Sequence, residues 1–192
     1  MTAVDERGLA DYLDTFEPPE GVKAELLRGV IVMMASPDLV HNLIVLHTLR
    51  QIPMDRWYPI QTQDVDIVGE ESVPIPDLLV AAPDVLPASG RLLPSQLVTT
   101  VVEVVSKSSV HQDYVVKRSI YAAGRVPAYL IIDPIMAQCV LLTRPEGDGE
   151  DANYLTQQIT KFGDPVSLDV LGVELATSDF GTLPDVRPHR YP

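Results

Sequence analysis

Two isolated carboxylates, each inside an apolar run typical of a β-strand, are the groups in this 192-residue sequence most suited to chemistry. Asp77 lies in the run 74–80, and Glu103 lies in the Val-rich run 97–105. Burying an unpaired charge is strongly unfavourable, so we expect a cation to compensate both carboxylates. Because hard oxygen ligands suit Mg²⁺ or Mn²⁺, the sequence predicts a site for one of these ions.

Strand geometry indicates how the two carboxylates can meet. Side chains alternate between the two faces of a strand, so Asp77 shares a face with Leu79, and Glu103 shares a face with Val101. If the two runs are neighbouring strands, both carboxylates reach one metal ion, and the peptide carbonyl of Val104 adds a third oxygen ligand. The alternative is two strand-end carboxylates that point at solvent.

The segment after Glu103 has helical periodicity and carries a lysine on its inward face. Val110, Tyr114, Lys117 and Tyr121 recur at intervals of 4, 3 and 4 residues, which predicts one face packed on the sheet. Lys117 then points toward the carboxylates, where it stabilises a phosphate or orients a water. Arg118 falls on the other side of the helix. The alternative for Lys117 is a lysine that extends outward to solvent.

The remaining patterns predict a mixed α/β fold, a long sheet with helices on its faces. A β-hairpin is expected at residues 23–35. The loop 83–95 and the tail 184–192 are expected to be irregular. The other expected elements are helices at 5–16, 36–52 and 109–123, and strands at 57–68, 75–82, 97–105, 128–132, 138–143 and 153–159.

The composition excludes or disfavours several classes of function. The chain is 46% hydrophobic and 21% charged, which is typical of a globular protein. No apolar run approaches the ~20 residues of a membrane-spanning helix, so no membrane association is expected. A single cysteine, Cys139, excludes an intrachain disulfide and favours the cytoplasm. The net charge of −13 argues against tight binding of long nucleic acids by this chain alone.

Several segments together resemble the Uma family of putative restriction endonucleases, within the PD-(D/E)xK nuclease superfamily. Three features depart from the pattern. Val105 stands where the superfamily has its strand lysine, Val30 replaces an acid after the hairpin glycine, and the segment 105–109 lacks the proline often seen after its serine. The matching segments, which fall within residues 20–160, are the hairpin 25–33, the helix start at 36–37, the acidic strands 75–80 and 102–106, the helix 113–121 and the segment 124–134.

The resemblance implies a restriction-endonuclease-like fold and a metal-dependent endonuclease. The nucleic acid that it would cleave is DNA. Asp77 and Glu103 would hold Mg²⁺ or Mn²⁺, and Lys117 would supply the catalytic cation from the helix. Glu25 would help to hold the metal or a water. The implied organisation is a helical extension at 1–19, the nuclease domain at 20–180 and an irregular tail at 181–192.

Two further residues are candidate substrate contacts. His41, beside Asn42, is expected to be exposed or to pack against its helix, with a substrate contact as the alternative. Lys107 is expected to be solvated, although its closeness to Glu103 would let it touch a phosphate. Two rival functions follow from the acidic charge and the missing strand lysine. One is a non-catalytic binding or assembly module, and the other is a nuclease subunit that acts as a homodimer or with a basic partner protein.

Overall fold

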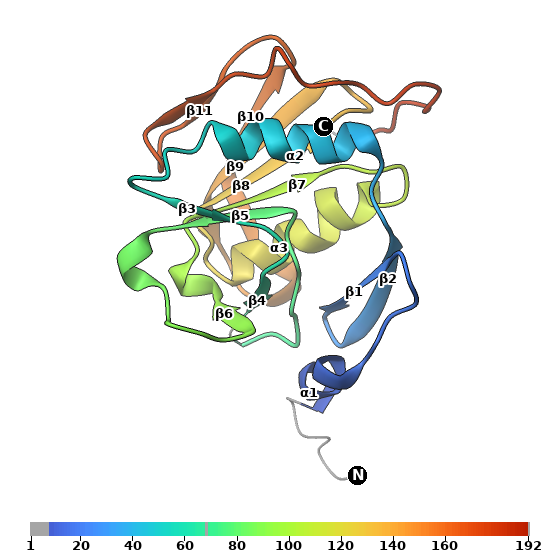
Figure 1. Cartoon of the computed structure of the whole chain (residues 1–192), viewed down its shortest axis with the longest axis vertical. Helices are drawn as coiled ribbons and strands as arrows, with labels where there is room; N and C mark the ends of the chain where they lie inside the picture. The colour runs from blue at the N-terminus through green and yellow to red at the C-terminus, as the bar shows by residue number, and fades with distance from the viewer. Residues whose placement is uncertain (1–7, 68, 192) are drawn as a thin grey trace.

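A six-stranded mixed sheet forms the centre of the computed structural model, which describes residues 8–67 and 69–191 (Figure 1). The strand order is β10-β9-β8-β7-β5-β3, with β7 parallel to β8 and the other neighbours antiparallel. The predicted mixed sheet is therefore confirmed. Its strands are β3 (Tyr58–Ile60), β5 (Leu78–Ala81), β7 (Thr100–Val104), β8 (Ala128–Asp133), β9 (Gln138–Glu146) and β10 (Asn153–Lys161).

Each face of the sheet buries its own hydrophobic core, because alternate side chains of the central strands point to opposite sides. Val102 and Val104 pack with α2 and the β11–β12 hairpin, whereas Val101 and Val105 pack with α3 and the β4–β6 pair. The covering elements are α2 (Leu39–Arg50), α3 (Lys117–Ala123) with the π-turn η3 (Gln112–Val116) before it, β4 (Asp64–Asp66), β6 (Leu92–Pro94), β11 (Val166–Leu168) and β12 (Val173–Leu175).

The predicted hairpin is confirmed as β1 (Val22–Leu27) and β2 (Val30–Ala35), which form a separate two-stranded sheet. Its turn residues, Arg28 and Gly29, both have positive φ angles, 49° and 71°, the signature of a type I′ turn. Before the hairpin comes α1 (Gly8–Thr15). Residues 5–7 of the helix expected at 5–16 lie outside the described residues.

Helix α2 begins after a capping residue, Asp38. Asp38 accepts a hydrogen bond from the backbone N–H of His41 at 3.0 Å, which satisfies one of the free donors of the first turn. This cap fixes the turn that carries His41. No helix in the described part of the chain is long and apolar enough to cross a membrane.

Some expected strand boundaries are wrong. The single strand expected at 57–68 is two strands in different sheets: β3 joins the central sheet, and β4 pairs in parallel with β6. Between them Thr62 has a φ of 55°, which ends the extended run, and Val68 lies outside the described residues. Strand β6 lies inside the expected loop 83–95. The short strands β11 and β12 are an addition to the expected order.

Candidate active site

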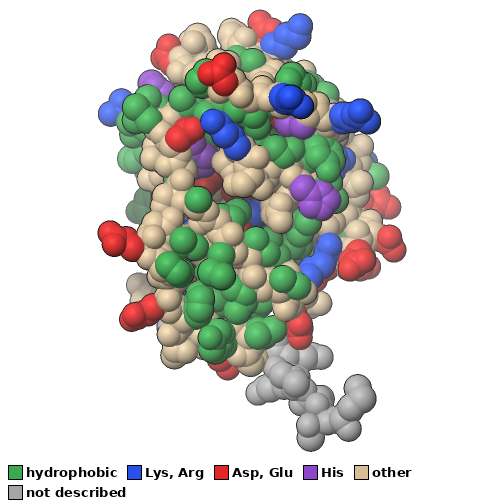
Figure 2. Space-filling view, turned by 90° about the vertical axis from the view of Figure 1, so that its right-hand side faces the viewer, with side chains coloured by type: hydrophobic (Ala, Val, Ile, Leu, Met, Phe, Trp, Pro, Cys, Tyr) green, Lys and Arg blue, Asp and Glu red, His purple; other side chains and the backbone are tan. Residues whose placement is uncertain are grey.

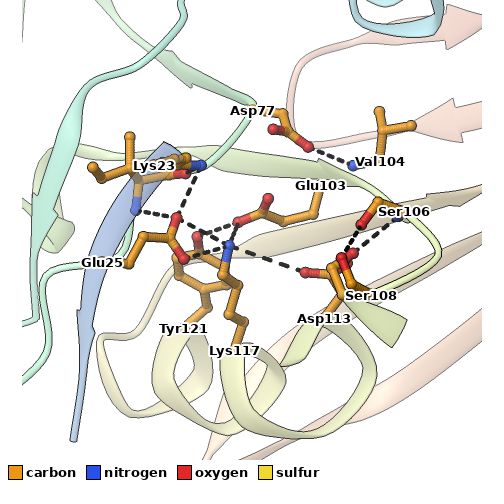
Figure 3. A network of polar contacts seen from close by, with 12 residues as sticks. Lys23, Glu25, Asp77, Glu103, Val104, Ser106, Ser108, Asp113, Lys117 and Tyr121 are labelled. Atoms are coloured by element: carbon orange, nitrogen blue, oxygen red, sulfur yellow. Dashed lines mark hydrogen bonds and ion pairs between the residues drawn. The ribbon is translucent and has the colours of Figure 1, made fainter. Parts of the chain in front are cut away.

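Glu103 lies on the α3 face of β7, buried beside the helix. Strand alternation puts it on the side of Val101, as its sequence position predicts, and its side chain is almost fully buried. Its Oε1 accepts hydrogen bonds from Lys117 Nζ at 2.8 Å and from the hydroxyl of Tyr121 at 2.7 Å (Figure 3). A buried carboxylate therefore has a cation and a hydroxyl as direct partners.

Asp77 immediately precedes β5, the antiparallel neighbour of β7. Its Oδ2 accepts a hydrogen bond from the backbone N–H of Val104 at 2.8 Å. The same oxygen lies 2.9 Å from Nε2 of His41. Asp77, Glu103 and Val104 line one cleft, so the two strands bring both predicted carboxylates to the same place.

Glu25 reaches the same cluster from β1 and is fully buried. Its Oε1 accepts from the N–H of Ile75 at 3.0 Å and from Lys117 Nζ at 3.2 Å, and its Oε2 lies 3.0 Å from that nitrogen. Lys23 Nζ lies 2.9 Å from Glu25 and also donates to the carbonyl of Ile75. The hairpin is thus attached both to the segment that leads into β5 and to the helix.

Asp113 is a further carboxylate of the cluster, and it is not one of the residues of the predicted inward stripe. It is buried, its Oδ1 lies 4.0 Å from Lys117 Nζ, and its Oδ2 accepts a hydrogen bond from Ser109. The π-turn explains the difference from a regular helix: it contains one extra residue per turn, so Asp113 and the adjacent Tyr114 both face inward. The four-residue spacing between Asp113 and Lys117 is the sequence pattern from which their proximity could have been predicted.

The structure separates the other basic candidates from the cleft. Arg118 donates to the side chains of Asn153 and Gln157 on β10, on the other side of the helix from the cluster. Lys107 is exposed on the turn after β7 and does not line the cleft. His41, in contrast, lines the cleft and is only 7% exposed, so of its two expected placements, exposed or packed against its helix, the exposed one is wrong.

Charge and burial shift the acid–base behaviour of the cluster. Burial alone would raise the pKa of Asp77, but the hydrogen bond and charge of His41 lower it to about 2. Burial raises the pKa of Glu103 to about 7, only partly offset by the charge of Lys117. The pKa of Asp113 is raised well above its usual range, chiefly by burial. Burial disfavours the charged form of Lys117, yet Glu103 and the other carboxylates raise its pKa. Lys117 therefore stays charged.

The cleft can accept a small hydrated ion. Its volume is about 60 Å³, enough for a few waters and too small for a nucleotide. Four carboxyl groups converge here on Lys117 and Lys23 (Figure 3), with His41 beside Asp77, and the raised pKa values of Glu103 and Asp113 show that these two hold their protons more readily than free carboxyl groups do. Within residues 8–67 and 69–191, no three His, Cys, Asp or Glu side chains form a ready-made metal cluster. The fitting donors are two carboxylates and one carbonyl, all hard oxygens.

Comparison with known proteins identifies the class of fold. The fold is that of restriction-endonuclease-like nucleases. A solved structure of "a putative nuclease belonging to DUF820 from Anabaena variabilis ATCC 29413" is similar, with a TM-score of 0.70 and 12% sequence identity, covering 88% of this chain and 95% of that chain. No curated protein matches the sequence.

The family follows from the sequence itself. The model of the Uma2 family, described as "Putative restriction endonuclease", matches residues 9–178. The chain belongs to this family, as its motifs predict. Family and fold support a nuclease role, and a nuclease implies a nucleic-acid substrate.

Proposed function

We propose that this protein is a divalent-metal-dependent endonuclease that hydrolyses phosphodiester bonds of DNA by attack of water. The observation that carries the proposal is the convergence of Asp77 and Glu103 on one cleft, beside the buried ammonium group of Lys117. Proteins of the restriction-endonuclease-like class generally use divalent ions. The cleft suits such use because its donors are hard oxygens.

In this proposal Asp77, Glu103 and the carbonyl of Val104 hold Mg²⁺ or Mn²⁺. The ion supplies positive charge for the phosphate and acidifies water. Asp77 suits a ligand because its depressed pKa keeps it ionised across the physiological range. Glu103, whose pKa is about 7, would lose its proton when the ion binds.

The surrounding residues position these ligands. Lys117 holds Glu103 and Glu25 in place and offsets charge that develops on the phosphate. Glu25 is a weaker ligand or orients a water. Nε2 of His41 hydrogen-bonds one oxygen of Asp77, which restricts the rotation of this carboxylate, and a substrate contact of His41 is a second proposed role.

Cleavage of supercoiled plasmid and of a labelled duplex tests this function. The wild type is expected to cleave with Mg²⁺ or Mn²⁺ and not with EDTA, and Asp77→Asn and Glu103→Gln are expected to lose at least about 100-fold in rate. Glu174→Gln removes an exposed acid on β12 and is the matched control. Equal activity of Asp77→Asn and wild type, or cleavage that persists in EDTA, would refute the proposal.

A non-catalytic binding module is the second candidate, and one observation favours it. Asp77 and Glu103 already have protein partners, so the cluster is internally paired without an ion. In that case Mn²⁺ at millimolar concentration would not bind the cleft. A third candidate keeps the chemistry and takes its DNA affinity from a basic partner protein, which the charge of −13 favours.

A further inference from the structure

The C-terminal arm, residues 183–191, has no helix or strand, yet it is attached to the sheet at two points. The backbone N–H of Leu183 donates to a carbonyl in the turn after β8 at 3.0 Å. Six residues later, Nε2 of His189 lies 2.6 Å from Oδ2 of Asp133, which is fully buried at the end of β8. These contacts fix the course of the arm across the end of the sheet.

A third attachment joins the arm to the helical segment that carries the site. The ring of Tyr191 stacks on Tyr114, with centroids 5.6 Å apart and planes inclined by 14°. The hydroxyl of Tyr191 lies 3.0 Å from Nδ1 of His111. His111 and Tyr114 flank Asp113, so the arm is anchored within one helical turn of the catalytic cluster.

The arm carries positive charge on an acidic protein. Arg187 and Arg190 are both exposed, and Asp185 is the one acid among the nine residues of the arm. Exposed Lys107 lies on the turn that leads into the same helical segment. The whole chain, in contrast, has 27 acidic against 14 basic residues. The net charge of the arm and Lys107 is therefore opposite in sign to the net charge of the whole chain.

The arm also lies on the side of the molecule where a substrate would approach the cleft. Gly181, two residues before the arm, lies against Val40 at the start of α2. In Figure 1 the last part of the chain reaches the right-hand side of the molecule, which faces the viewer in Figure 2. The Lys and Arg side chains visible on this face gather mainly in its upper half, where Asp and Glu side chains also lie, whereas hydrophobic side chains predominate in the lower half. The cleft is too small for a nucleotide, so the backbone of a nucleic acid must cross its rim.

We propose that the C-terminal arm is a nucleic-acid-binding element, in which Arg187 and Arg190 contact backbone phosphates next to the phosphate in the cleft. The inference rests on the proposed nuclease function and extends it to the surface that binds substrate. Lys107 contributes a third phosphate contact from the turn after β7. Guanidinium groups suit this role because they pair with phosphate oxygens through two parallel hydrogen bonds.

Fluorescence anisotropy with a labelled 20-base-pair duplex, in Ca²⁺ to prevent cleavage, tests the arm. The variant is Arg187→Ala/Arg190→Ala. The control, Arg50→Ala/Arg144→Ala, removes the same charge from exposed positions at the end of α2 and on β9. Each phosphate contact contributes a slope of about 0.9 to log K against log salt. Loss of two contacts should therefore weaken binding roughly 60-fold at 0.1 M salt and lower the slope by about 2. A single strand of the same sequence distinguishes duplex from single-stranded binding.

The outcomes distinguish a failure of the arm proposal from a failure of the nuclease proposal on which it rests. If wild type and control bind and the arm variant binds as tightly, the arm proposal fails and the nuclease proposal stands. If the wild type binds neither duplex nor single strand, both fail. Tyr191→Ala keeps both arginines and removes their anchor, so it should also weaken binding, whereas Tyr191→Phe, which retains the stacked ring, should recover part of the affinity. Equal melting temperatures show that each variant folds.

Discussion

Replacing Lys117 with methionine tests the electrostatics of the cluster directly. In the wild type, Nζ of this fully buried lysine lies 2.8 Å from Glu103, 3.0 Å from Glu25 and 4.0 Å from Asp113. At an effective dielectric constant of ~20, each such attraction is on the order of 4–6 kcal/mol before desolvation is subtracted. Removing the cation leaves three buried carboxyl groups, and those that are ionised repel one another.

The expected net loss for Lys117→Met at pH 8 is about 3–5 kcal/mol of unfolding free energy, the usual cost of breaking a buried pair. For a chain of this length, that loss corresponds to a fall in melting temperature of roughly 6–20 °C. The loss should be smaller at pH 5, because the carboxylates of the variant take up protons in the folded state. Since the folded state then binds more protons than the unfolded state, stability decreases as pH rises.

Differential scanning calorimetry at pH 5 and pH 8, in buffer with EDTA, measures this effect. Arg118→Met, one position along the helix, is the control, because its partners are the exposed side chains of Asn153 and Gln157. A fall below about 2 °C at pH 8 for Lys117→Met, or a fall of equal size at both pH values, would show that the lysine does not hold the carboxylates together.

Three further predictions follow from the same cluster. Mn²⁺ should raise the melting temperature of the wild type but not of Asp77→Asn, because an ion that binds only the folded state stabilises it; an equal rise in both proteins would place the ion elsewhere. Without metal, wild-type stability should fall by on the order of 3 kcal/mol between about pH 4.5 and pH 7, since folded Glu103 keeps its proton to about pH 7. Denaturant titrations should show this slope flattened in Glu103→Gln, and a retained slope would assign it to another group. In cleavage assays, Lys117→Ala should lose at least about 100-fold in rate, while Lys107→Ala and Arg118→Ala retain catalysis once DNA is saturating; full activity of Lys117→Ala would refute its role.

Strand alternation predicts the core of the site well. The isolation of Glu103 among valines indicates both a buried strand and the face shared with Val101, and the structure places it there. The helical stripe likewise predicts that Lys117 and Tyr121 face the sheet and that Arg118 does not. These patterns succeed because burial on one side of a regular element leaves a fixed period in the sequence.

Features set by long-range contacts or irregular backbone could not be predicted in the same way. His41 is buried because the start of α2 lies over Asp77, 36 residues along the chain, and a helical wheel does not show what covers a face. Asp113 lies four residues before Lys117 and so near the inward stripe, but a regular 100° wheel does not contain the π-turn in which Asp113 and Tyr114 are both buried. The run 57–68 alternates as a strand should, but the left-handed φ of Thr62 divides it between two sheets.

The most direct test of the central claim is a crystal structure of the protein soaked in Mn²⁺, with data collected for anomalous scattering. If the mechanism is metal-dependent, one anomalous peak should lie in the cleft, within coordination distance, about 2.0–2.3 Å, of oxygen atoms of both Asp77 and Glu103. A cleft without a peak at millimolar Mn²⁺, or a peak that contacts neither carboxylate, would contradict the metal-dependent mechanism.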